Sequence, residues 1–102
     1  MDFLAVPDAW PVAAAAFREA AEQFESAELT AEAFRDRAVR ILQELSTTSP
    51  HAAELLAPRL DKVRHTAGDD LAEVAGPLAA DIEQIAQAIA EINQAHIPLM
   101  GL

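Results

Sequence analysis

Apolar residues recur at seven-residue steps through the first half of the chain, from Trp10 to Leu45. Alanine, Phe34 or Ile41 occupies each half-step between them. Residues at this spacing lie along one face of an α-helix. The pattern predicts a single long helix over about 8–46 with one apolar stripe, and such a stripe needs a surface to cover it.

A similar apolar repeat follows in the second half, from Leu71 to Leu99. Between the two repeats, residues 46–50 read Ser-Thr-Thr-Ser-Pro, which is typical of a turn. Ser49 can cap the next helix, and Pro50 suits its first position. We therefore expect a turn at about 47–49.

The second helix is expected over about 50–96. Proline removes a helical hydrogen bond, so Gly76-Pro77 predicts a bend or a local break, and Pro98 predicts the end of the helix. Two breaks stay open from the sequence: near Leu29-Thr30, where Thr30 could cap a new helix, and between Gly68 and Pro77. The seven-residue apolar repeat continues across Thr30 without a change of register, which favours an unbroken first helix.

These segments predict an all-α fold, a single helical domain over 1–102. Residues 1–7 form an extended lead-in and 97–102 an apolar tail. Two long helices joined by a short turn make an antiparallel hairpin. A lone hairpin cannot cover its stripe on both flanks, so we expect two hairpins to form a four-helix bundle on dimerisation.

Composition and charge exclude several classes of protein. The chain has 17 Asp and Glu against 7 Lys and Arg, a net charge of −10, which disfavours nucleic-acid binding. No apolar run approaches the roughly 20 residues of a membrane span. There is no cysteine, so disulfides and thiolate metal sites are excluded.

The uncovered stripe predicts an interface with a helical protein partner or with a second copy of the chain. Aromatic and branched aliphatic residues would anchor it. The candidate interface residues are Trp10, Phe17, Phe24, Phe34, Leu78, Ile85 and Ile92.

Basic residues cluster in sequence on both sides of the predicted turn. In the hairpin they would converge into a charged tip of opposite sign to the rest of the molecule. The alternative is an ordinary solvated face with ion pairs along each helix, such as Asp36–Arg40. The candidate tip residues are Arg35, Arg37, Arg40, Arg59, Lys62 and Arg64.

No arrangement of residues points to catalysis. The three histidines do not form a His-x-x-x-His pair, and no Glu-x-x-His occurs. Asp61, His65 and Asp69 share a helix face, but zinc needs three or four strong ligands. We expect no enzymatic activity, no cofactor and no metal.

The opening residues Met1 to Asp8, the Ala-rich helix that follows and Thr47-Thr48 before the second helix resemble the small helical-hairpin proteins of type VII secretion systems, the ESAT-like (WXG) and PE group. The chain lacks that group's Trp-x-Gly turn and its Tyr-x-x-x-Asp/Glu signal. The resemblance implies a secretion substrate or pairing companion, cytoplasmic before export and secreted without a signal peptide.

The expected function is therefore a protein–protein interaction module of the type VII kind, pairing with itself or with a second helical hairpin. The alternative is an acidic inhibitor or antitoxin-like protein that binds a basic target through its carboxylates. Salt separates the two, because screening weakens an electrostatic complex and hardly affects an apolar one.

Overall fold

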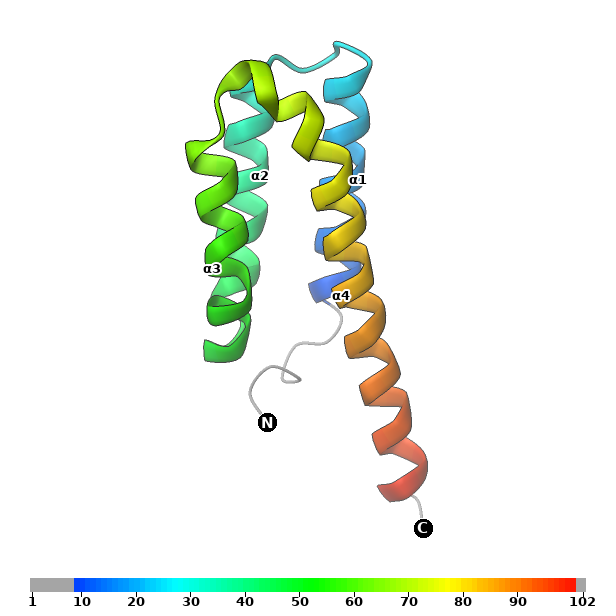
Figure 1. Ribbon diagram of the computed structural model, residues 1–102. Coiled ribbons are helices and arrows are strands. Elements are labelled where there is room, and N and C mark those ends of the chain that lie inside the picture. Colours follow the sequence, from blue (N-terminus) through cyan, green and yellow to red (C-terminus); the bar gives the residue numbers. More distant parts are fainter. Residues whose placement is uncertain (1–8, 101–102) are drawn as a thin grey trace.

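A computed structural model describes residues 9–100, with side chains described for residues 9–92. Within this range the chain forms four α-helices, a short 3-10 helix and no strand, which confirms the all-α prediction. Figure 1 shows the helices running alternately up and down. The elements are α1 (Ala9–Glu25), α2 (Ala31–Ser46), α3 (Pro50–His65), η2 (Gly68–Asp70) and α4 (Leu71–Met100). The predicted lead-in and residues 101–102 lie outside the described residues.

The predicted single helix over 8–46 is wrong, because the chain breaks between α1 and α2. Ala27 adopts a left-handed backbone with φ 67°. The Glu28 N–H donates to the Gln23 carbonyl at 2.7 Å, and the Ala27 N–H donates to the Phe24 carbonyl at 3.1 Å. This is the Schellman arrangement that ends helices, here with alanine at the position usually held by glycine. Thr30 then caps α2, because its hydroxyl accepts from the Ala33 N–H at 3.1 Å.

Replacing Ala27 with glycine is expected to stabilise the protein. The left-handed conformation costs a non-glycine residue about 1–2 kcal/mol, and glycine is free of most of this cost. Glycine also has more conformational freedom in the unfolded chain, which opposes part of this stabilisation. We therefore expect the free energy of unfolding in urea to rise by a net amount of about 0.5–1 kcal/mol. The same change at Ala33, inside α2, should instead destabilise by about 1 kcal/mol. A loss of stability at both positions would contradict this account of the break.

The second turn lies where the sequence predicts it. α2 ends at Ser46 and α3 begins at Pro50. The buried Ser49 hydroxyl accepts from the Ala52 N–H at 3.0 Å, so the cap is confirmed. Pro50 occupies the first turn of α3, where its missing N–H costs nothing.

The predicted second helix over 50–96 is also two helices. α3 ends at His65, and the 3-10 turn η2 leads into α4. The break lies near Gly68, one of the two places that the sequence left open. α4 continues without a break through Gly76-Pro77, where the sequence predicted a bend or a local break. It also continues through Pro98, so the predicted end of the helix there is wrong. Burial of the surrounding residues of α4, such as Ala75 and Leu78, offsets the hydrogen bond that Pro77 removes.

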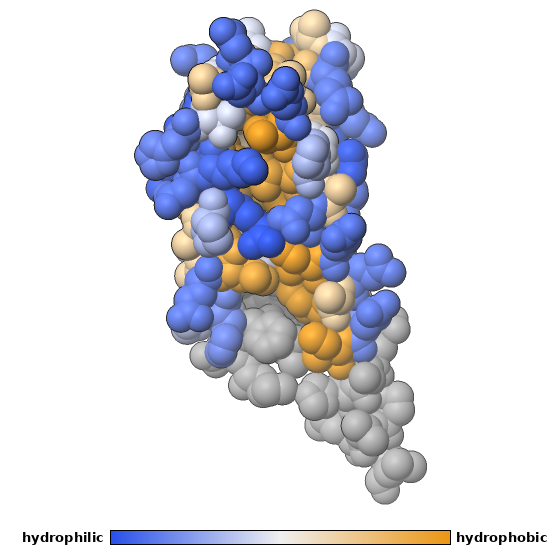
Figure 2. Space-filling model, viewed as in Figure 1, coloured by the Kyte–Doolittle hydropathy of each residue, from blue (hydrophilic) through white to orange (hydrophobic). Residues whose placement is uncertain are grey.

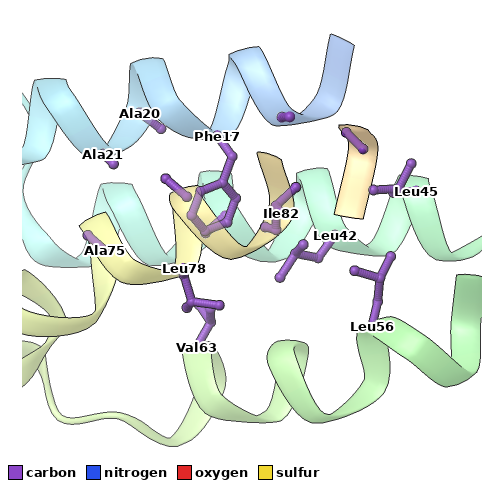
Figure 3. Close-up of a cluster of buried hydrophobic side chains, with 14 of the residues drawn as sticks. Phe17, Ala20, Ala21, Leu42, Leu45, Leu56, Val63, Ala75, Leu78 and Ile82 are labelled. Atoms are coloured by element: carbon purple, nitrogen blue, oxygen red, sulfur yellow. The ribbon is translucent and has the colours of Figure 1, made fainter. Parts of the chain in front are cut away.

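All four helices point side chains into one core, as Figure 3 shows. Its largest fully buried members are Trp10, Phe17, Phe34, Leu42, Leu56, Leu71, Ile82 and Val63. Leu42 falls outside the seven-residue repeat, yet it is fully buried on the same face of α2 as Phe34, Ala38 and Leu45, which belong to the repeat. The bundle therefore forms within one chain, and a second chain is not needed to reach four helices.

The packing around the core is uneven. α1 packs against both α2 and α4, and α2 packs against α3. α3 and α4 form the open side of the bundle, where a groove of about 490 Å³ separates them. Figure 2 shows hydrophobic surface between these two helices, flanked on each side by hydrophilic residues.

Candidate interaction surface

The two ends of the bundle differ in chemistry. We call the end at the turn 47–49 the turn end; residues 9–17, 41–58 and 84–92 build it. The opposite end holds both longer connections, and we call it the loop end; residues 18–40 and 59–83 build it.

Large hydrophobic side chains are exposed at the turn end. Val12 is 70% exposed, Leu55 40% and Ile92 41%, and no other large hydrophobic residue among residues 9–92 is exposed. They lie on three different helices. Single exposed apolar residues are common on protein surfaces, so the informative observation is that all three lie at this one end.

A shallow apolar groove runs between α1 and α2 at this end, with a volume of about 410 Å³. Alanines make up most of its α1 wall, and their small side chains leave the space that forms the groove. Glu44 is the one charged residue in its lining. The lining residues are Ala9, Val12, Ala13, Ala16, Ile41, Glu44, Leu45 and Thr48.

Charge is sparse at the turn end. Glu44, Glu54 and Glu91 are its only carboxylates, and it has no Lys or Arg. All 7 Lys and Arg residues of the chain belong to the loop end, together with most of the 17 carboxylates. Depletion of charged residues is what distinguishes the centre of a protein interface from the rest of a surface.

Two ion pairs join α4 to its neighbours at the boundary between the two ends. Arg18 of α1 donates to both carboxylate oxygens of Glu83, at 2.7 and 3.0 Å. These hydrogen bonds hold the pKa of Glu83 below its usual value and raise the pKa of Arg18. Arg59 of α3 pairs in the same way with Asp81. Both pairs are partly exposed, so each contributes under about 1 kcal/mol.

The last part of α4 extends beyond the other helices at the turn end. Figure 1 shows α4 continuing past the ends of α2 and α3. Among the α4 residues whose side chains are described, which end at Ile92, the last that the core buries is Ile89, and the helix continues to Met100. Residues 93–100 contain no Asp, Glu, Lys or Arg. They would span about 12 Å as helix.

The structure places the predicted interface residues in two groups. Trp10, Phe17, Phe34 and Leu78 are buried in the core of the single chain, so in this fold they cannot meet a partner. They were expected at an interface because a two-helix hairpin would have left them uncovered. The remaining three, Phe24, Ile85 and Ile92, reach the surface in part.

Phe24 stacks on Phe34 with ring centroids 4.9 Å apart, so one face of its ring is already in contact with the core of its own chain. The Trp10 Nε1 lies buried at the turn end, with no hydrogen-bond partner among the described residues.

The predicted charged tip is not formed at the turn. In α2, Arg35 and Arg37 fall in the half of the helix away from the turn, and Arg40 lies near its middle. Arg35 donates to the carbonyls of Val63 and Arg64 at the end of α3, and Arg37 donates to Gln23. These cations hold helices together and lie among the carboxylates of the loop end.

Sequence reasoning missed Val12 and Leu55, the exposed apolar residues of α1 and α3. One signal for Val12 was present, since residues 9–17 carry no charge. Leu55 had no comparable signal, because its neighbour Leu56 is fully buried and the two look alike in the sequence.

The groove between α3 and α4 is a weaker candidate. Proline rings line both of its walls, at Pro58 and Pro77, and the Arg59–Asp81 pair lies in it. Its walls carry charges of both signs that already satisfy each other in part. No group of three or more metal-ligating side chains occurs among the described residues, and His65 contacts the Asp61 carbonyl of its own helix.

The architecture and this surface define an all-α protein of four antiparallel helices with one charge-poor end. Comparison with models of protein families, with curated proteins and with solved structures gave no match. Along the described part of the chain, none of the helices combines the length and apolar character that crossing a membrane requires.

Proposed function

We propose that this protein is an interaction module that binds a helical partner protein through its turn end. One observation carries the proposal: the exposed large hydrophobic residues among residues 9–92 all lie at the end where charge is sparse. Water solvates such a surface poorly, and burying it against a partner is favourable by roughly 25 cal/mol per Å². The α1–α2 groove suits a helix, because amphipathic helices bind in apolar grooves of this kind.

The resemblance to type VII secretion proteins suggests a setting for this module, as a secretion substrate or a pairing companion. That part of the proposal rests on the opening residues and the Ala-rich first helix. The two long helices that also supported it are broken in the structure, each into two. The binding surface proposed here does not depend on that setting.

The acidic inhibitor stays a second candidate with less support. A basic target would bind the loop end, where the carboxylates gather. There, however, all 7 cations lie between the carboxylates, and several are already paired with the protein's own groups. A complex through the loop end would weaken steeply as salt rises, whereas one through the turn end would not.

Position-specific cross-linking in the cells that make the protein tests the proposed function. A photo-reactive residue at Val12 is expected to give one discrete covalent adduct. The same residue at Ala72, an exposed apolar position on a helix of the loop end, should give none. Val12 is 70% exposed, so its replacement leaves the core intact. Adducts from Ala72 alone, or from neither position, would show that the turn end is not the binding surface.

A further inference from the structure

We propose that the helical partner is a second copy of this chain, with residues 93–100 of each copy lying in the α1–α2 groove of the other. This inference rests on the proposed function, because it names the partner that the turn end binds. Two bundles related by a two-fold axis would meet at their turn ends, and each would supply one helix and one groove.

The first argument is the fit of lengths and positions. The extension of α4 over 93–100 leaves the bundle at the same end at which the groove lies. The groove spans residues 9–16 of α1, which is as many residues as the extension has. In the two-fold arrangement the extension would run parallel to the partner's α1, so the two helical segments would match along about 12 Å.

The second argument is electrostatic. Two chains of net charge −10 repel each other, so they can associate only where that charge is sparse. The turn end is that place, because the extension has no charged residue and the groove has only Glu44. A contact through the loop ends would instead bring most of the 17 carboxylates of each chain together.

The third argument is helix stability. A short helical segment without packing is marginal in water, because nucleation and propagation alone do not stabilise it. The last part of α4 extends beyond α2 and α3, and Ile92 at its start is 41% exposed. A groove of a second copy would cover this segment and would itself be filled.

Cysteine cross-linking tests the inference cleanly, because the chain has no cysteine of its own. A Val12→Cys chain is mixed with chains that carry one cysteine at each position from 93 to 97 in turn. One or two of these five mixtures should oxidise rapidly to a covalent dimer of twice 10.9 kDa. An Ala72→Cys chain in place of the Val12→Cys chain should give at least tenfold less dimer.

Light scattering on the purified full-length chain gives an independent reading. We expect a dimer that Val12→Glu weakens by at least about tenfold, and that Ala72→Glu, at an exposed position of α4 at the loop end, leaves unchanged. Added salt should leave the dimer as tight or tighter, because it screens the repulsion between two acidic chains.

Three results would overturn the inference. The first is a chain that stays monomeric at all concentrations and forms no disulfide with positions 93–97. The second is an intramolecular disulfide between Val12→Cys and Leu4→Cys, which would show that the chain's own first residues fill the groove. The third is a Val12 photo-adduct of a mass other than two copies. That last result would remove self-pairing and keep the interaction module, whereas no adduct at all would remove both.

Discussion

Replacing Phe34 with alanine is expected to lower the free energy of unfolding by about 3–5 kcal/mol. Phe34 is fully buried in α2, and its ring contacts two other aromatic rings. The Phe17 ring meets it edge-on with centroids 5.9 Å apart, and the Phe24 ring stacks on it at 4.9 Å. Alanine would remove both ring contacts and leave a cavity where α1 and α2 meet. A small domain has roughly 5–15 kcal/mol of stability in total, so a large share would be lost.

Urea unfolding followed by far-ultraviolet circular dichroism measures this loss. Phe24→Ala is the control, because it removes one of the same ring contacts from a half-buried position. We expect it to cost less than half as much as Phe34→Ala. Equal losses would mean that Phe34 is not at the centre of the core.

Replacing Leu56 with alanine is expected to lower the free energy of unfolding by about 2–4 kcal/mol and to loosen α3 selectively. α3 has three buried residues, Ala52, Leu56 and Val63, and it packs on α2 without packing closely on α4. Leu56 is fully buried, since none of its surface is accessible to solvent. Its loss removes the central buried contact of α3. Helices with few buried contacts open locally before the rest of a protein unfolds, so α3 should open first.

Hydrogen exchange at single amides tests this prediction. Amides of α3 should exchange much faster in Leu56→Ala, while those of α1 and α4 should change less. Leu55→Ala is a matched control with the same residue type one position earlier, where the side chain is 40% exposed. It should change stability by under about 0.5 kcal/mol. A uniform loss of protection in all four helices would show that α3 does not open independently.

The local signals in the sequence predicted the elements that depend on local chemistry. The turn at 47–49, the Ser49 cap and the place of Pro50 follow from side chains that bond to their own backbone neighbours. The all-α class follows from apolar spacing. Such features need no knowledge of distant parts of the chain.

The break after α1 could not be predicted with the same confidence, because its signal is weak. Ala27 holds a conformation that glycine or asparagine usually adopts, and alanine is otherwise the best helix former. Thr30 was readable as a cap, but the apolar phase across it favoured continuity. The break is stabilised only by tertiary packing, because it lets α1 and α2 enclose the same core.

The candidate surface was predictable in part. The uncharged stretches at 9–17 and 93–100 are visible in the sequence, and Ile92 was identified as an interface residue. That these stretches lie at one end of the molecule depends on how the helices pair. Trp10, Phe17 and Phe34 lie in the core of the single chain for the same reason, since a four-helix chain buries what a hairpin would expose.

The sequence by itself determined that this protein is helical, where its central turn lies and which stretches are apolar, because these properties depend on side-chain chemistry and short spacings. Only the tertiary structure decided which apolar residues are covered and where the charges gather. The physical reason is that burial and surface potential belong to the arrangement of all four helices. Moving one helix end by a few residues changes which side chains it brings together.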